Sequence, residues 1–403
     1  MNSFNKLPQE SRKILNSIPE LINKTFPIPG KFRGALPSDI AELSRMLTNS
    51  RGERSLSYLG RPNYLSAYLH YFLPWNLYRL CTLLPALNLK LSEGSIITDL
   101  GCGPLTFASA LWITRPDLRA APLEFNCVDR VLSVLEAGKK FFKALCEQTG
   151  TENSCAWKIN IIKKDININK SVSRADRRNA SLVCAVNMFN EQYDRIPHNN
   201  TTALRDMAKK AALFMHGEAS QDASILTVEP GVPQSGRFIA FLRAELMELG
   251  RMPSSPCPHS TDCPLLYKQS QRQTPAGKQQ TNKKRWCHFA FEAADAPKDL
   301  QSLSAAAKLP KERLAFSFLL AGETKKQESF GVRVISDAFP LPGGWLGRYG
   351  CSEQGLVLLA GEKNCIEKAG SGSLLEQGGR SSFSLTVTGE RDAKSGAVIM
   401  ELK

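Results

Sequence analysis

Short apolar runs alternate with segments of helical periodicity over the middle of the chain. Apolar residues are continuous or nearly so at residues 96–100, 124–129, 157–162, 181–186 and 224–230, which predicts five strands. The segments at 107–113, 131–145 and 203–214 carry apolar residues at helical spacing, which predicts helices between them. A further strand is expected at 314–320. Strands that alternate with helices favour a parallel α/β sheet covered on both faces.

The chain before this region is expected to be helical. Ile40, Leu43 and Leu47 recur at helical spacing, and Ser38 just before them is the predicted N-cap. An apolar and aromatic stretch follows, and Pro74 within it is expected to break or kink a helix. Residues 1–90 are therefore predicted to form an N-terminal helical region.

The chain after residue 325 has a different pattern. Short apolar runs at 332–335, 356–359 and 382–387 are separated by glycine-containing turns. We interpret residues 326–403 as a small C-terminal β extension of barrel-like form. The α/β domain then spans residues 91–325 and contains an insertion at 251–298 that is rich in Pro, Cys, Gln, Lys and Ser.

Acidic residues and glycines stand where three successive predicted strands end. Gly101 and Gly103, in the run Asp99-Leu100-Gly101-Cys102-Gly103-Pro104, let the backbone turn tightly and approach a ligand closely. Asp129 ends the second strand, where a carboxylate can accept two ribose hydroxyls. Asp165 follows the third strand and could face an adenine amino group. With Asp99, these residues predict a site for a nucleoside cofactor, and a Rossmann-like shell that has lost its ligand is the alternative.

The glycine pattern distinguishes between cofactors, but the segment after the fourth strand identifies no catalytic residue. A third glycine is replaced by Thr106, which disfavours a nicotinamide cofactor and leaves S-adenosylmethionine as our prediction. Residues 187–191 lack the prolines of the motif common in methyl transfer to base amines. Asn187 and Glu191 could touch a substrate, although Glu191 could equally pair structurally, and Cys184 is expected to be packed inside the strand.

Cysteines in the insertion predict a metal site. Cys257, Cys263 and Cys287 lie in polar, proline-flanked sequence that does not suit a core, although unmetallated thiols stay an alternative.

Three thiolates need a fourth ligand, and Cys351 is the best candidate because a turn there can fold back from the β region. Four thiolates suit zinc or an iron–sulfur cluster. His259 or His288 as fourth ligand would indicate zinc.

The charge of the chain favours a polyanionic partner. Lys and Arg number 52 against 38 Asp and Glu, a net charge of +14. Such an excess supplies sequence-independent affinity for nucleic acid, and a merely solvated basic surface is the alternative. No apolar run is long enough for a membrane span, and the N-terminus lacks the pattern of a secretory signal, so we expect no membrane partner. We therefore also expect the 11 cysteines to form no disulfide framework.

The chain resembles a known family at four places, in this order: Asp99 to Pro104, Val228-Glu229-Pro230-Gly231, Cys257 to Pro264 and Trp286-Cys287-His288-Phe289. It looks like the methyltransferase-like factors associated with the mitochondrial small ribosomal subunit, which also have bacterial relatives. The resemblance covers about residues 50–360. The stretch between Cys263 and Cys287 is longer than is usual in that family.

The resemblance implies a class I S-adenosylmethionine methyltransferase Rossmann-like fold, binding to small-subunit rRNA and a role in subunit assembly. It also implies a 4Fe–4S cluster held by Cys257, Cys263, Cys287 and Cys351. The alternatives are an active RNA methyltransferase with a structural zinc site, and an interaction module with a vestigial pocket. We expect a free monomer, located in the cytoplasm if bacterial and in an organelle matrix if eukaryotic.

Overall fold

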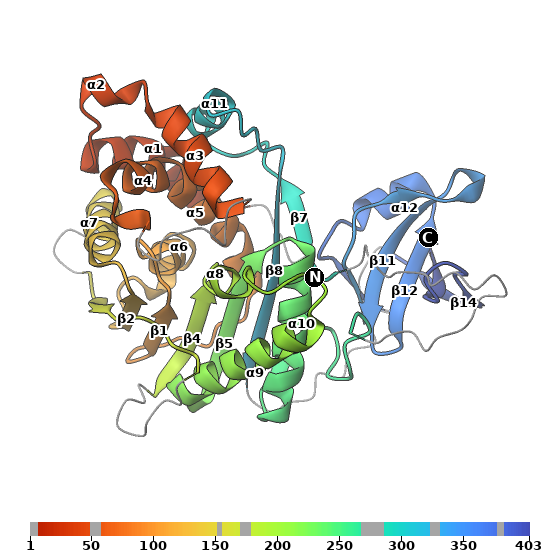
Figure 1. The fold of residues 1–403 in the computed structure, drawn as a ribbon. Helices are drawn as coiled ribbons and strands as arrows, with labels where there is room; N and C mark the ends of the chain where they lie inside the picture. The colour runs from red at the N-terminus through yellow and green to blue at the C-terminus, as the bar shows by residue number, and fades with distance from the viewer. Residues whose placement is uncertain are drawn as a thin grey trace.

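The computed structural model describes residues 7–48, 58–150, 155–169, 179–266, 286–322, 331–376 and 383–403. The middle of the predicted polar insertion, residues 269–282, lies outside these ranges. The described chain contains two sheets, and Figure 1 shows them side by side, the first flanked by helices and the second formed by the C-terminal part.

The first sheet has the strand order β3-β2-β1-β4-β5-β8-β6, with β7 also paired to β8. Its strands are β1 (Ile96–Leu100), β2 (Glu124–Asp129), β3 (Lys158–Lys163), β4 (Ala180–Val186), β5 (Ala219–Pro230), β6 (Met252–Ser255), β7 (Phe289–Glu292) and β8 (Arg313–Gly322). The first five are parallel, whereas β8 runs antiparallel to β5. The prediction of a class I methyltransferase-type, Rossmann-like α/β fold is confirmed.

Helices cover both faces of this sheet because alternate residues of its strands point to opposite sides. In β4, Leu182 and Cys184 join the buried cluster on one face, and Val183 and Ala185 join the cluster on the other. The first face packs against α1 (Gln9–Thr25), α5 (Leu73–Leu83), α6 (Thr106–Thr114) and α7 (Leu132–Gln148). The second packs against α8 (Asn190–Tyr193), α9 (Thr201–Glu218) and α10 (Pro233–Glu248).

The N-terminal helices share one core with the first face of the sheet. Besides α1 and α5 they are α2 (Gly30–Arg33), α3 (Leu36–Thr48) and α4 (Pro62–Ala67), with α11 (Lys298–Ala306) beside them. The prediction of Ser38 as N-cap is wrong, because α3 already begins at Leu36. Ser38 lies in the first turn, and its hydroxyl donates to the carbonyl of Ala35 at 2.7 Å.

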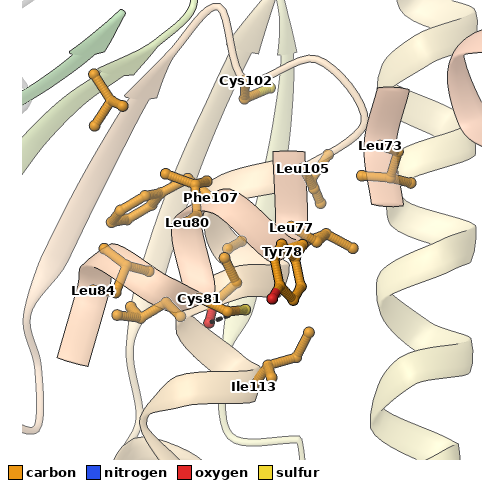
Figure 2. Close-up of a cluster of buried hydrophobic side chains, with 14 of the residues drawn as sticks. Leu73, Leu77, Tyr78, Leu80, Cys81, Leu84, Cys102, Leu105, Phe107 and Ile113 are labelled. Atoms are coloured by element: carbon orange, nitrogen blue, oxygen red, sulfur yellow. Dashed lines mark hydrogen bonds between the residues drawn. The ribbon is translucent and has the colours of Figure 1, made fainter. Parts of the chain in front are cut away.

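Pro74 does not interrupt the helix. A wide π-helical turn, Tyr68–Phe72, precedes α5, and the N–H of Leu73 donates to the carbonyl of Tyr68 five residues earlier. Because Pro74 has no N–H, the widened turn accommodates it within continuous helix. Figure 2 shows the result: side chains of α5 such as Leu77 and Cys81 pack against Phe107 and neighbouring residues of α6.

The second sheet is open, with the order β13-β9-β11-β12-β15-β14 and with β10 paired to β11. Its elements are β9 (Gly331–Val334), β10 (Phe339–Pro340), β11 (Leu346–Ser352), β12 (Gly355–Gly361), α12 (Lys363–Lys368), β13 (Leu374–Glu376), β14 (Leu385–Arg391) and β15 (Val398–Leu402). The edge strands β13 and β14 do not pair with each other in the described strand order. The β extension is therefore an open sheet and not the barrel-like form expected from the sequence.

Among the helices of the described ranges, none combines the length and apolar composition that crossing a membrane requires.

Candidate cofactor pocket and cysteine cluster

The turn after β1 needs glycine at Gly101 for two reasons. Its φ is +65°, a conformation that residues with a Cβ rarely adopt. A Cβ at this position would also lie 2.8 Å from the Cβ of Met188, in the segment after β4. Gly101 therefore lets the two loops at the carboxyl edge of the sheet approach each other.

Asp129, at the end of β2, is held by the same turn. The N–H of Gly103 donates to its Oδ2 at 3.1 Å, and the N–H of Val131 donates to its Oδ1 at 3.0 Å. Burial raises the pKa of Asp129, and these two hydrogen bonds oppose that rise. Because each carboxylate oxygen can accept a second hydrogen bond, Asp129 is oriented and still able to bind a diol.

A cavity of about 260 Å³ opens beside Asp129. Of the predicted cofactor residues, Gly101, Asp129 and Asp165 line it. Its other lining residues are Leu59, Arg130, Val131, Lys164, Ile166, Asn187, Met188, Glu191, Gln192 and Arg195. The structure thus brings residues from the ends of β1, β2, β3 and β4 to one site, as expected for parallel strands.

Asp99 and Gly103 are not among the lining residues. Gly103 acts through Asp129, and Asp99 is buried in β1 beside β4 with 1% of its surface exposed. The thiol of Cys184 donates to Asp99 Oδ1 at 3.4 Å, whereas Oδ2 is buried without a hydrogen-bond partner. Burial raises the pKa of Asp99 to about 7. A direct contact of Asp99 with a cofactor stays a prediction.

Glu229, at the end of β5, fixes the loop that follows β4. Its carboxylate accepts the N–H of Phe189 at 2.9 Å and the N–H of Asn190 at 3.1 Å, and the Tyr193 hydroxyl lies 2.9 Å from Oε2. Burial raises its pKa to about 8. The fully buried Glu229 therefore holds the segment that carries Asn187 against the cavity.

The four predicted metal ligands come together at the junction of the two sheets; we call Cys257, Cys263, Cys287 and Cys351 the cysteine cluster. The first two follow β6, the third precedes β7, and Cys351 lies on β11 of the second sheet. Burial raises the pKa of Cys351, and the charges of the other three thiols raise it further. Burial and the charges of two thiols, Cys257 and Cys263, likewise raise the pKa of Cys287. The four side chains are thus electrostatic neighbours.

Two buried arginines surround the cysteine cluster. Arg243 of α10 donates from Nη2 to the carbonyls of His259 at 2.9 Å and Thr261 at 2.6 Å. Arg333 of β9 donates from Nε to the carbonyl of Pro256 at 2.9 Å and from Nη1 to that of Gly372 at 2.8 Å. Their positive charges also lower the pKa of Cys287. Both guanidinium groups therefore fix the loop and favour negative charge on the thiols.

Of the two candidate histidines, only His259 contacts the cysteine cluster within the described residues. Its Nε2 lies 3.2 Å from the Sγ of Cys351, and its Nδ1 lies 2.8 Å from Thr261 Oγ1. Burial lowers the pKa of His259 to about 4. His288 instead stacks on Trp286 at 4.6 Å between ring centroids. Nowhere in the described ranges do three Cys, His, Asp or Glu side chains form a site for a single metal ion.

Sequence reasoning missed the arginines and the role of Glu229. Glu229 had a signal, because it belongs to the run Val228-Glu229-Pro230-Gly231. Arg243 lies within an amphipathic helix and Arg333 within a short apolar strand, so neither had a local signal.

Comparisons with solved structures give matches of low identity and low TM-score. An antibiotic-related methyltransferase is 13% identical, with a TM-score of 0.32, and the match covers 58% of this chain and 89% of that one. A methyltransferase from Geobacter sulfurreducens in complex with S-adenosyl-L-homocysteine is 11% identical, with a TM-score of 0.31 and coverages of 62% and 91%. The plantazolicin methyltransferase in complex with SAH is 13% identical, with a TM-score of 0.27 and coverages of 78% and 99%. The strand order, rather than these superpositions, defines the fold.

Comparison of sequences gives the family. No curated protein sequence matches the chain. The family model described as mitochondrial small ribosomal subunit Rsm22 matches residues 133–340, slightly more than half of the chain. This range contains the loop after β4, Glu229, and three members of the cysteine cluster. The chain therefore belongs to the Rsm22 family.

Proposed function

We propose that the cavity at the carboxyl edge of the first sheet binds S-adenosylmethionine. The observation that carries the proposal is the position of Asp129, which lines the cavity with both oxygens oriented by backbone N–H groups. Asp129 would accept the ribose hydroxyls, and Asp165 would face the adenine. Gly101 lets the turn lie close to Met188, where a Cβ would collide. When bound, the cofactor supplies an electrophilic methyl group.

Two buried hydrogen-bond acceptors also support binding of S-adenosylmethionine. Asp99 Oδ2 and Asn187 Oδ1 both lack a hydrogen-bond partner in the described structure. Buried acceptors of this kind cost free energy unless a donor reaches them. The ammonium group of the cofactor's amino acid part is such a donor, which supports the prediction that Asp99 contributes to cofactor binding.

Calorimetric titration with S-adenosylmethionine tests the proposal. Asp129→Ala should weaken binding roughly a hundredfold, because two hydrogen bonds to a charged group are lost. Asp117→Ala is the matched control, since Asp117 is an exposed carboxylate paired with Arg115 and lies outside the cavity. Absence of binding by the unmodified chain would support the vestigial pocket instead.

We also propose that the protein binds small-subunit rRNA and acts in assembly of the small ribosomal subunit, as a free monomer in an organelle matrix if the source is eukaryotic. Membership of the Rsm22 family and the net charge of +14 support this. Affinity for rRNA should fall steeply with salt, because phosphate neutralisation releases counterions. Sedimentation with purified small subunits at two salt concentrations measures it, and salt-independent or absent association would contradict the proposal.

The cysteine cluster is proposed to hold a 4Fe–4S cluster, with zinc as the alternative. The donor set fits, because four thiolates are the usual ligands of such a cluster and two guanidinium groups balance its negative charge. The mutual electrostatic influence of the four thiols supports a shared site, and the family resemblance favours iron and sulfur over zinc.

Anaerobic purification with visible absorbance and metal analysis tests the cluster. We expect a brown protein with about four irons per chain. Cys257→Ser should lose most of the iron, whereas Cys365→Ser, which changes a partly exposed thiol of α12 outside the cluster, should retain it. A colourless protein with one zinc per chain would overturn the iron–sulfur proposal.

A second candidate function, RNA methylation, is favoured by the position of Asn187 and Glu191 on the cavity wall. Glu191 is paired with Arg130 at 2.7 Å, so Asn187 is the better candidate for a substrate contact. Radiolabelled methyl transfer to small-subunit rRNA separates enzyme from scaffold. Transfer that Asn187→Ala abolishes while cofactor binding persists would establish the enzyme, and no transfer by the unmodified chain would favour the scaffold.

A further inference from the structure

Cys146 and Cys155 form a pair of thiols outside the cysteine cluster. Cys146 lies on α7 and is 4% exposed, whereas Cys155 stands three residues before β3 and is exposed. The thiol of Cys146 donates to the Sγ of Cys155, and the two sulfur atoms are 3.6 Å apart. A disulfide bond is about 2.05 Å long, so the sulfurs need to approach by only about 1.5 Å to form one. The pair is therefore within reach of a disulfide bond, and one of its members is open to solvent.

Two tryptophans anchor the chain segments that carry the two thiols. Trp112 of α6 donates from its indole N–H to the hydroxyl of Thr149, three residues after Cys146, at 3.0 Å. Trp157 stands two residues after Cys155, and its ring meets that of Trp112 edge to face with the centroids 4.9 Å apart. Both segments are thus fixed on one aromatic core, because buried aromatic side chains pack in defined orientations. The proximity of the thiols is therefore a consequence of the packing.

The hydrogen bond between them makes the two thiols unequal. Because Cys146 donates, it stabilises a thiolate at Cys155 and lowers the pKa of that thiol, although burial opposes the shift. The same hydrogen bond and burial raise the pKa of Cys146, and the negative charge of Cys155 raises it further. Of the other charged neighbours, Arg119 lowers the pKa of Cys146 and Glu147 raises it. Since the thiolate is the form that attacks a disulfide, the exposed Cys155 is the nucleophile of the pair.

We propose that Cys146 and Cys155 are a redox-active pair that reacts with low-molecular-weight disulfides such as oxidised glutathione. The Cys155 thiolate attacks one sulfur of the small disulfide, whose S–S bond breaks, so that one small thiolate leaves and a mixed disulfide forms at Cys155. The charge that raised the pKa of Cys146 is then gone, while Arg119 still favours its thiolate. Cys146 loses its proton to solvent and attacks the Sγ of Cys155, which releases the second small thiolate. Two protein thiols are thus oxidised to one disulfide, and the small disulfide is reduced to two thiols.

This site goes beyond the proposed function, because neither cysteine lines the cofactor cavity or belongs to the cysteine cluster. One reversible bond also differs from the disulfide framework that the sequence argues against. In reducing compartments the disulfides that do form are usually transient and catalytic or redox-sensing. A solvent-accessible thiol of low pKa beside a resolving thiol is typical of such sensors. Oxidation would join α7 to the chain that enters β3, the edge strand of the first sheet.

Mass spectrometry of the full chain tests the proposal. Trypsin releases both cysteines in one peptide, residues 144–158, which contains no other cysteine. After incubation with oxidised glutathione and alkylation of the remaining thiols, this peptide should carry no alkyl group and should have lost two hydrogen atoms, and dithiothreitol should reverse the change. Cys365 is the control in the same sample, because it is a partly exposed thiol that, within the described ranges, hydrogen-bonds to no second thiol. Cys155 should react at least about fivefold faster than Cys365.

Two variants separate the roles of the thiols. Cys146→Ser keeps a hydrogen-bond donor but cannot resolve the mixed disulfide, so glutathione should stay bound to Cys155. Cys155→Ser leaves only the buried Cys146 and should take up no glutathione. A peptide that keeps both thiols in the unmodified chain, or a mixed disulfide at Cys155 that persists there, would overturn the proposal. Because these two outcomes are measured on the unmodified chain, they do not depend on the folding of a variant.

Discussion

The cofactor pocket and the cysteine cluster are assembled in opposite ways. The pocket draws its residues from the ends of consecutive parallel strands, so local motifs along the chain converge by the topology of the sheet alone. The cysteine cluster draws on the loop after β6, the residues before β7, and β11 of the other sheet, and its two neighbouring arginines come from α10 and β9. The pocket therefore belongs to one folding unit, whereas the cysteine cluster exists only when both sheets are in place.

The largest expected effect is a pH dependence of the free energy of unfolding, because Asp99, on the strand that leads into the glycine turn, is a buried carboxyl group. The pKa of Asp99 is about 7 in the folded chain and near 3.8 when unfolded. A raised pKa in the folded state stabilises the protein below pH 4, and this contribution is lost as the pH rises toward 7.

Asp99→Asn keeps an acceptor for Cys184 and removes the titration. Over pH 4 to 7, the free energy of unfolding of the unmodified chain should fall relative to this variant by up to about 4 kcal/mol. Urea unfolding of both proteins across this range measures the difference. Parallel stability curves would show that Asp99 ionises normally.

The second prediction concerns the junction. Arg333→Met removes the donors to the carbonyls of Pro256 and Gly372 and should lower the free energy of unfolding by about 3 kcal/mol. Arg391→Met, which removes an exposed arginine of β14, should cost less than about 1 kcal/mol. Affinity for S-adenosylmethionine, measured in the same preparations, should stay within about twofold. A parallel loss of cofactor affinity would mean that the two regions are coupled.

A third prediction compares substitutions of two glycines in the turn after β1. Gly101→Ala places a Cβ against Met188 at a positive φ and should cost about 2–3 kcal/mol of stability and much of the cofactor affinity. Gly103→Ala also meets a positive φ, but its Cβ would only make an ordinary contact with the Tyr68 hydroxyl at 3.9 Å, so about 1 kcal/mol is expected. Thermal unfolding measures the loss of stability in each glycine variant, and calorimetry measures the loss of cofactor affinity. Equal losses in the two variants would show that contact with Met188 is unimportant.

The sequence predicted β1 to β5 and β8 because they read as nearly continuous apolar runs, as strands at the centre of a covered sheet do. It did not predict β6 and β7, which lie in the expected polar insertion and are only partly buried. The bounds of β1 and β2 agree with the predicted ranges, and β5 begins five residues earlier than expected. The additional residues of β5 are partly polar and exposed, so hydrophobicity could not mark them. The expected break at Pro74 does not occur, because a widened turn, which depends on backbone hydrogen bonds and leaves no signature in composition, precedes it.

The positions of residues at strand ends could be predicted from the sequence, whereas the positions of groups that act through packing could not; the binding roles of both stay predictions. Asp129 and Asp165 line the cavity as their positions suggested. Within the described residues Asp99 Oδ2 has no hydrogen-bond partner, which depends on what does not lie beside it, and a linear sequence carries no record of that.

The wide turn at Tyr68–Phe72 can be regarded as one extra residue inserted into a continuous helix. Each residue turns an α-helix by about 100°, so such an insertion rotates everything before it relative to α5. Tyr68 stands at its start, near Gly103, while Asn76 and Arg79 stand beyond it. Deleting one residue there would leave composition almost unchanged and yet swing Tyr68 away from the glycine turn. The exact number of residues in this helix therefore determines whether Tyr68 reaches the glycine turn.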